Sequence, residues 1–68
     1  MAQKEDAQVI QKAIRSLPLK YREVIVLRHL QNLSYIEIAN ILKLPTGTVK
    51  VHLYRAREQL RKILKTSI

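Results

Sequence analysis

The sequence has no cysteine and only one glycine, and these absences limit what the protein can be. Without cysteine there is neither a disulfide nor a thiolate metal site, so the 68 residues must be held together by apolar packing. The longest apolar run is four residues, Val24 to Leu27, which is too short to cross a membrane. No repeat or linker divides the sequence, so we expect one domain over residues 1–68. The absence of cysteine favours a reducing compartment, and the N-terminal residues, which have no apolar core, are not expected to form a secretory leader.

Acidic side chains are scarce. Thirteen Lys and Arg residues oppose five Asp and Glu residues, which gives a net charge of +8. Residues 1–42 carry six basic and four acidic side chains, whereas residues 43–68 carry seven basic side chains and one acid, Glu58. A positive charge concentrated at one end of a chain is typical of a surface that binds phosphates, so it favours nucleic acid as the partner.

Apolar residues recur at helical spacing along the chain, and no segment alternates as a strand would. The pattern predicts four helices, over about residues 6–16, 19–30, 35–42 and 47–65. The Leu17-Pro18 pair separates the first two, because a residue before proline avoids helical angles. Three helices have side chains suited to cap their N-terminal ends. These are Asp6 for the first helix, Ser34 together with Glu37 as a capping box for the third, and either Thr46 or Thr48 for the fourth.

Only a few residues around Leu44-Pro45 connect the third and fourth predicted helices. A short helix, a tight turn and a long basic helix match a helix-turn-helix. We therefore predict an all-α fold, a small four-helix domain that contains a helix-turn-helix and resembles a winged-helix domain without the wing. The second helix is apolar on nearly every side, so it is expected to be the most buried.

The fourth predicted helix has two different faces. At about 100° per residue, one face is an apolar stripe of Val49, Leu53, Ala56 and Leu60, flanked by His52 and Arg57. The opposite face combines positive charge, an aromatic ring and a small apolar group. It carries Val51, Tyr54, Arg55, Glu58 and Lys62, with Lys50 at one margin and Thr48 at the other. Such a mixture suits the DNA major groove, where Arg and Lys donate to guanine and apolar groups contact the thymine methyl.

Two residues of this helix set limits on the contact. The carboxylate of Glu58 would repel phosphates, so base contacts are expected to end near Arg55. Gly47 is the only glycine of the chain. It indicates either a backbone angle that other residues disfavour or a close approach of the backbone to a phosphate.

Nothing in the sequence suggests catalysis or a cofactor. His29 and His52 stand alone, without other ligands at metal-binding spacing, and no serine has a base at a plausible spacing. We therefore expect no enzyme, no metal and no cofactor. The flanking position of His52 makes it a candidate phosphate contact instead.

Several motifs occur together in a specific order. They are Leu17-Pro18, Tyr21-Arg22, Val24, Leu27-Arg28, Leu33-Ser34-Tyr35-Ile36-Glu37-Ile38-Ala39, Leu44-Pro45-Thr46-Gly47-Thr48-Val49-Lys50 and Leu53-Tyr54-Arg55-Ala56-Arg57. In these residues the chain resembles region 4 of the sigma-70 family, most closely the extracytoplasmic-function group, over about residues 6–64.

The resemblance implies a DNA-binding domain of a bacterial, cytoplasmic transcription initiation factor. In that family, region 4 binds the −35 promoter element through the second helix of its helix-turn-helix. It also docks on the flap of the RNA polymerase β subunit, and an anti-sigma factor holds many members inactive. Carried over to this chain, the −35 contacts are Lys50, Val51, Tyr54 and Arg55, with Thr48 and Arg57 as supporting phosphate contacts. A complete member also has a region 2, so we expect this chain to be either an excised C-terminal domain, which we favour, or a natural truncated form. In isolation it is expected to be a monomer.

Other functions fit parts of the sequence. The output domain of a LuxR-type response regulator shares Thr48, Val49, Lys50 and His52 with this chain. A protein-interaction module would bind polymerase or an anti-sigma factor without DNA. A basic amphipathic peptide on a membrane surface is a further alternative, although such a peptide needs no packed core.

Overall fold

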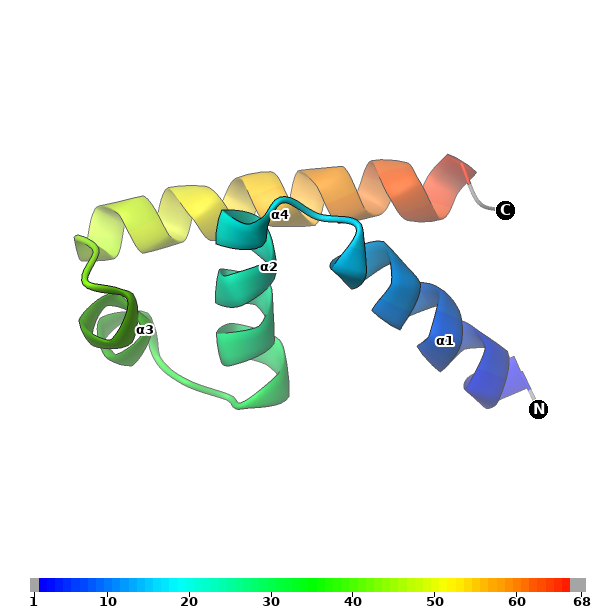
Figure 1. Cartoon of the computed structure of the whole chain (residues 1–68), viewed down its shortest axis with the longest axis horizontal. Helices are drawn as coiled ribbons and strands as arrows, with labels where there is room; N and C mark the ends of the chain where they lie inside the picture. The colour runs from blue at the N-terminus through cyan, green and yellow to red at the C-terminus, as the bar shows by residue number, and fades with distance from the viewer. Residues whose placement is uncertain (1, 67–68) are drawn as a thin grey trace.

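Four helical segments follow one another in the computed structural model, which describes the backbone of residues 2–66 and the side chains of residues 8–65 (Figure 1). The segments are α1 (Ala2–Arg15), α2 (Leu19–Ile25) continued by the π-helical turn η1 (Val26–Leu30), α3 (Tyr35–Leu42) and α4 (Thr46–Thr66). The described residues contain no strand. The predicted all-α fold is therefore confirmed, with α3 and α4 forming the helix-turn-helix.

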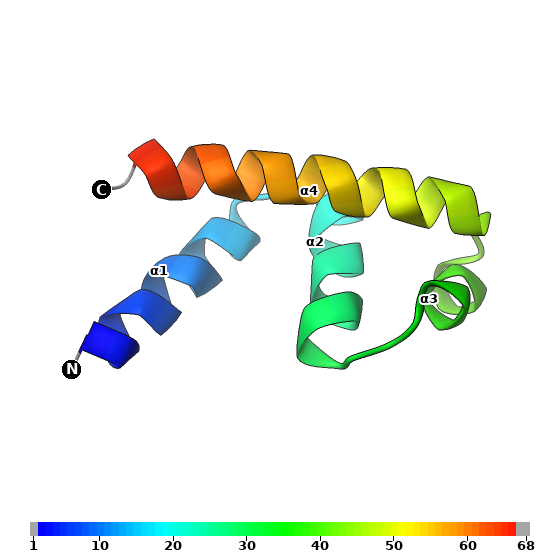
Figure 2. The ribbon, with the colours of Figure 1, turned by 180° about the vertical axis from the view of Figure 1, so that it is seen from behind.

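Helix α4 organises the molecule. Its 21 residues extend over about 32 Å, most of the 38 Å length of the protein. Helix α2 runs steeply away from the middle of α4, and α3 lies beside the N-terminal end of α4 (Figures 1 and 2). Helix α1 diverges from the C-terminal half of α4 (Figure 2). The three shorter segments are thus all arranged against one long helix.

The core lies where α2, α3 and α4 meet. Val24 from α2, Ile38 from α3 and Val49 from α4 are completely buried. The other members of the buried cluster are Leu17, Tyr21, Ile25, Ala39, Leu53 and Ala56. Because α2, α3 and α4 each contribute a few apolar residues to one cluster, none of these three helices can bury its apolar face without the other two.

The capping box predicted at the start of α3 is confirmed. The Ser34 hydroxyl accepts a hydrogen bond from the Glu37 N–H at 3.1 Å, and the Ser34 N–H donates to Glu37 Oε1 at 2.8 Å. The Ser34 N–H, and after it the Ser34 side chain, stabilise the ionised carboxyl and hold the pKa of Glu37 below its ordinary value. Helix α3 therefore begins where the sequence indicated, at Tyr35.

The caps predicted for the first and the fourth helix are wrong. Asp6 lies inside α1, because that helix begins at Ala2. Thr46 and Thr48 both lie inside α4, and the carbonyl of Pro45 already accepts the Val49 N–H at 3.1 Å. The physical reason at α4 is that proline has a φ suited to a helix start and no N–H that would need a partner there.

The expectation that the second helix is the most buried holds only for its first part. Leu30 is 68% exposed, whereas Val24 and Ile25 are buried. The last turn is a π-helix in which the Gln31 N–H donates to the Val26 carbonyl at 3.2 Å. A π turn rotates the residues that follow relative to an α-helix. Leu30 consequently lies at the surface. Val9 and Ile10 of α1 and Ile41 of α3 are exposed as well.

The turn between α3 and α4 depends on one residue with left-handed backbone angles. Lys43 has φ 59° and ψ 45°, and its N–H donates to the Ala39 carbonyl. The Leu44 N–H donates to the same carbonyl at 3.0 Å. These bonds satisfy the end of α3 and redirect the chain into Pro45, as in helix ends closed by a left-handed residue.

Candidate nucleic-acid interface

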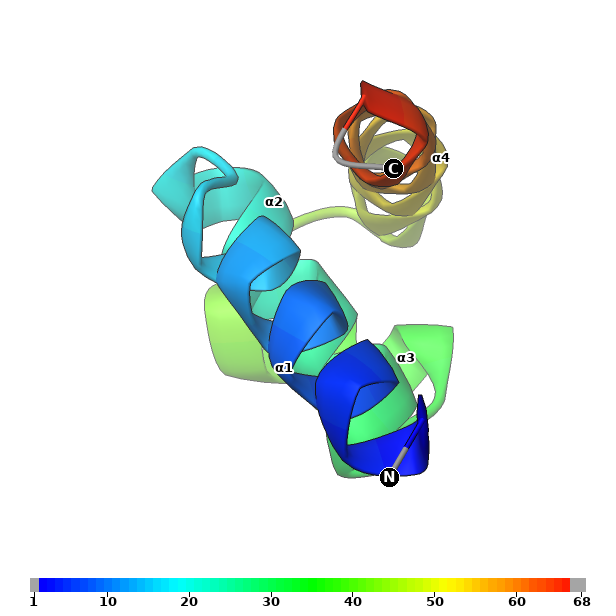
Figure 3. The same cartoon turned by 90° about the vertical axis from the view of Figure 1, so that its right-hand side faces the viewer.

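Helix α4 is covered on one side only. Figure 3 views it almost end-on, with α1, α2 and α3 all lying to one side of it. The covered stripe consists of Val49, Leu53 and Ala56, each at most 1% exposed. On the uncovered side, Tyr54 is 66% and Val51 is 45% exposed. The two faces predicted from the helical wheel are therefore present.

The exposed side of α4 offers a mixed chemical surface. Val51, Tyr54 and Arg55 are spaced i, i+3 and i+4, so they lie together on one face, which we call the recognition face. An exposed aromatic ring beside an exposed valine and a guanidinium is more apolar than a face that only needs to be solvated. It can make both hydrogen bonds and apolar contacts with base edges.

Lys50, at the edge of the recognition face, is part of a cation–aromatic cluster that sequence reasoning missed. Its ammonium nitrogen lies 5.7 Å from the ring centroid of Tyr35, the first residue of α3. The Arg28 guanidinium carbon, from η1, lies 5.0 Å from the same centroid. Arg28 Nη1 also donates to the Leu33 carbonyl at 2.9 Å, which fixes its position. Two cations gathered at one ring form a surface suited to a phosphate.

A helical wheel could not have found this cluster, because its three members come from three different elements. Tyr35 is half-buried at the start of α3. The signal that could have pointed to Arg28 is its presence on an otherwise apolar segment, since an isolated cation there needs a partner.

The two flanking candidates Thr48 and His52 are half-buried. The His52 ring packs edge-on against Tyr21 of α2, with 5.8 Å between ring centroids and 79° between the ring planes. Its Nδ1 atom is buried without a hydrogen-bond partner among the described residues. His52 is therefore part of the packing contact between α2 and α4.

The remaining candidate, Arg57, is exposed, and its positive charge affects the titration of His29 in η1. Burial lowers the pKa of His29 below its ordinary value, and the positive charges of Arg57 and Arg28 lower it further. Glu58 pairs with Arg61 at 2.6 Å. This ion pair offsets part of the negative charge that was expected to limit base contacts beyond Arg55.

Gly47 does not adopt a backbone angle that requires glycine. No glycine of the described chain has a positive φ. A Cβ atom placed on Gly47 would meet no heavy atom within 4 Å. Of the two explanations left open by the sequence, the one based on backbone angle is therefore wrong.

Comparison with known proteins identifies the family. The family model described as "Sigma-70, region 4" matches residues 7–60. The chain belongs to the sigma-70 region 4 family. The chain is therefore not the output domain of a response regulator, and its family is one of non-enzymatic DNA-binding domains.

Curated relatives of this region 4 domain are extracytoplasmic-function sigma factors. The ECF RNA polymerase sigma factor SigW of Bacillus subtilis (strain 168) is 52% identical over 61 residues, which cover 90% of this chain and 33% of the relative. The ECF RNA polymerase sigma-E factor of Escherichia coli (strain K12) is 45% identical over 60 residues, which cover 88% of this chain and 31% of the relative. The chain spans about a third of the length of these curated relatives.

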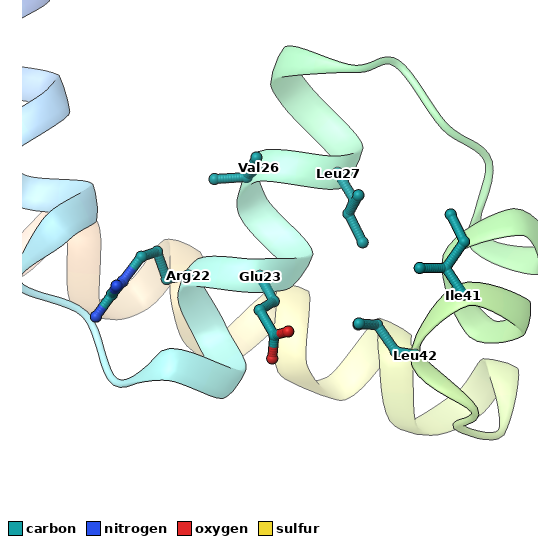
Figure 4. Close-up of a pocket in the computed structure, with 6 residues that line it drawn as sticks. All are labelled: Arg22, Glu23, Val26, Leu27, Ile41 and Leu42. Atoms are coloured by element: carbon teal, nitrogen blue, oxygen red, sulfur yellow. The ribbon is translucent and has the colours of Figure 1, made fainter.

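A second surface of the region 4 domain is an apolar groove between α2–η1 and α3, which we call the α2–α3 groove (Figure 4). Its volume is about 280 Å³, and its lining residues are Arg22, Glu23, Val26, Leu27, Ile41 and Leu42. Leu27, Ile41 and Leu42 point into it (Figure 4). None of the recognition-face residues lines this groove, so the two surfaces do not overlap.

The described residues carry neither a metal-ligand cluster nor a membrane-spanning helix. No group of three or more His, Cys, Asp or Glu side chains is placed to hold a metal ion. None of the helices there has the length and apolar character needed to cross a membrane.

Proposed function

We propose that this region 4 domain recognises the −35 promoter element by placing α4 in the major groove of the duplex. The observation that supports the proposal most directly is the exposed cluster of Val51, Tyr54 and Arg55 on the uncovered side of α4. A helix of about 10–12 Å diameter fits the major groove only if no other element blocks that side. The arrangement of α1, α2 and α3 on the other side leaves it accessible (Figure 3).

Each residue of the interface has a distinct part in the proposal. Arg55 donates to guanine O6 and N7, and Val51 and Tyr54 make apolar contacts with thymine methyl groups or sugars. Lys50 contacts bases or backbone at the edge of the groove. The supporting phosphate contacts are Thr48, His52 and Arg57, together with the newly identified Arg28 and Tyr35.

The charge of the domain fits this role. A net charge of +8 attracts a duplex at a distance, and each cation that neutralises a phosphate adds about one unit to the slope of log affinity against log salt. An isolated domain of this size is expected to bind a promoter weakly. In a whole sigma factor, tethering to polymerase and to the rest of the factor would raise its effective concentration at the promoter.

We further propose that the α2–α3 groove is the docking site for the flap of the RNA polymerase β subunit. The groove is apolar on a molecule whose surface is otherwise rich in positive charge, and such patches are typical of protein interfaces. It also leaves the recognition face free for DNA. The same apolar surface would suit an anti-sigma factor, which would then compete with polymerase in the bacterial cytoplasm.

Arg55→Ala tests the DNA contact. We expect it to weaken binding to a −35 duplex by about 1–3 kcal/mol and to relax the preference for one base pair, because the lost contact is to a base edge. The measurement is a fluorescence anisotropy titration against a −35 duplex and a scrambled duplex at fixed salt.

Arg15→Ala is the matched control, since it removes the same charge from an exposed site on α1. It should weaken both duplexes slightly and equally, through the lost charge alone. Equal losses for the two variants on both duplexes would contradict the recognition-face proposal. Binding of a flap fragment without any binding of duplex at low salt would favour the alternative of a pure interaction module.

A further inference from the structure

A third surface of the domain is a cavity between α1 and the α2–η1 segment, which we call the α1–α2 cavity. Its volume is about 240 Å³. Three aliphatic and three polar side chains line it, and they are Ile14, Val26, Leu30, Gln11, Arg15 and Arg22. Sites for small molecules usually measure about 300–1,000 Å³, so this cavity is better suited to a few side chains of a peptide.

The charge of the α1–α2 cavity is positive and uncompensated. Arg15 is the last residue of α1, and Arg22 lies in α2. Neither guanidinium forms an ion pair with any of residues 8–65, and no acidic side chain lines the cavity. Two guanidinium groups at one cavity are complementary to a carboxylate, which they can bind through charge-assisted hydrogen bonds.

Arg22 is held in place and still has donors to offer. Its Nη2 atom donates to the Leu17 carbonyl at 3.4 Å, which ties the side chain to the connection between α1 and α2. Its Nε atom is buried and has no hydrogen-bond partner among the described residues. The side chain points away from Leu27, Ile41 and Leu42 of the α2–α3 groove (Figure 4). Because a guanidinium has five N–H donors, Arg22 can bind an acceptor that enters the α1–α2 cavity.

The π turn supplies the apolar part of the cavity. Val26 and Leu30 are the first and last residues of η1, and Leu30 is 68% exposed. Such turns are rare and occur frequently at functional sites. An exposed leucine beside two cations gives the cavity an apolar contact as well as a charged one. It therefore fits a ligand that combines both properties.

We propose that the α1–α2 cavity binds a short acidic and apolar peptide segment of a partner protein. Arg15 and Arg22 hold a carboxylate of the peptide, and a large aliphatic side chain of the peptide packs against Ile14 and Leu30. A second copy of this chain is a poor occupant, because two net charges of +8 repel each other. DNA is a poor occupant too, since the cavity lies among the helices on the side of α4 away from the recognition face (Figure 3). The proposal is independent of the −35 contact.

Arg15→Gln tests the charged contact in the full chain. The probe is a fluorescein-labelled helical peptide of glutamate, leucine and alanine, followed by fluorescence anisotropy. Its affinity should fall about 5- to 10-fold, because a partly desolvated charge-assisted contact is lost. Lys12→Gln is the matched control, since it removes the same charge from an exposed site of α1 outside the cavity. It should weaken peptide binding by less than about twofold.

Leu30→Ala tests the apolar contact. The exposure of Leu30 means that its truncation leaves the buried cluster unchanged. Affinity for the peptide should fall about 3- to 10-fold, because apolar area buried by the peptide is lost. Leu19→Ala is the control, with the same truncation at a 62% exposed site outside the cavity. Its peptide affinity and the duplex affinity of both leucine variants should match the wild type.

Nuclear magnetic resonance of the isotope-labelled chain locates the peptide. The largest shift changes on titration should fall on Gln11, Ile14 and Leu30. Equal losses for Arg15→Gln and Lys12→Gln, or the largest changes on α4, would overturn the proposal, because the peptide would then bind by overall charge or elsewhere. Complete displacement of the peptide by a −35 duplex at constant ionic strength would assign it to the DNA surface, and absence of peptide binding at low salt would also overturn the proposal.

Discussion

At the scale of single residues, Glu37 shows how one side chain can make a helix sensitive to pH. Its carboxylate accepts the Ser34 N–H, and its own N–H donates to the Ser34 hydroxyl. Because the hydrogen bond favours the ionised form, the pKa of Glu37 lies below its ordinary value of 4.5. A lowered pKa means that the unfolded chain binds the proton more readily than the folded one.

We therefore expect the contribution of Glu37 to stability to be complete above about pH 4.5, its ordinary pKa, and to be lost as the pH falls through the lower folded value. Glu37→Gln keeps an acceptor for Ser34 but cannot titrate. Its melting temperature should decline less than that of the wild type between about pH 5.5 and pH 3. Thermal melts followed by circular dichroism at several pH values provide the measurement.

Glu23→Gln is the control for this series, since it removes an exposed carboxylate of α2 outside the capping box. Its pH profile should follow that of the wild type more closely than the profile of Glu37→Gln does. Parallel profiles for the wild type and Glu37→Gln would show that the capping box does not carry the acid sensitivity of α3.

At the scale of elements, the helix-turn-helix depends on how α3 ends. Lys43 adopts left-handed backbone angles, with φ 59° and ψ 45°, and this conformation directs the chain toward α4. A side chain with a Cβ atom is strained in that region by about 1 kcal/mol, whereas glycine is not. The turn is thus built with a residue that is not the most stable choice for its geometry.

Lys43→Gly should stabilise the domain by roughly 0.5–1 kcal/mol, because it removes this strain while keeping the bonds to the Ala39 carbonyl. Asn32→Gly is a matched control, since Asn32 has a similar φ of 57° but asparagine tolerates it better. Its gain should be smaller. Chemical denaturation of both variants gives the comparison, and a destabilised Lys43→Gly would indicate that the lysine side chain has a structural role.

At the scale of the whole molecule, one small domain presents two separate surfaces. The recognition face belongs to α4 alone, and the α2–α3 groove belongs to α2, η1 and α3. Both are held by the same buried cluster, in which Val24, Ile38 and Val49 come from three different helices. Contact with polymerase and contact with promoter are therefore expected to be separable by mutation.

Ile41→Glu is expected to separate them. Ile41 is 54% exposed, so the substitution should leave the fold intact, but it places a charge in the α2–α3 groove. Binding to a β-flap fragment of Bacillus subtilis RNA polymerase should weaken about tenfold or more, because the charge would be buried without a partner. Binding to a −35 duplex should change little by comparison.

Leu19→Glu is the control, because it adds the same charge at a 62% exposed site outside the groove. It should leave flap binding near the wild-type value. Equal flap binding by the wild type and Ile41→Glu would place the docking site elsewhere on the domain.

Local rules explain which predictions succeeded. The Ser34–Glu37 capping box, the break at Leu17-Pro18 and the buried stripe of α4 depend on residues within a few positions of one another, and all were predicted correctly. The caps at Asp6 and Thr46 failed because several side chains near a helix start can cap it, and the sequence does not say which one the backbone uses.

The sequence by itself determined the number of helices, the helix-turn-helix and the two faces of α4, because helical periodicity and capping are properties of neighbouring residues. Only the tertiary structure decided that Arg28, Tyr35 and Lys50 gather at one ring, that Leu30 and Ile41 stay exposed, and that Gly47 has open space around it. These features depend on how separate helices cross, and the crossing is set by the shared core, which no short stretch of sequence contains.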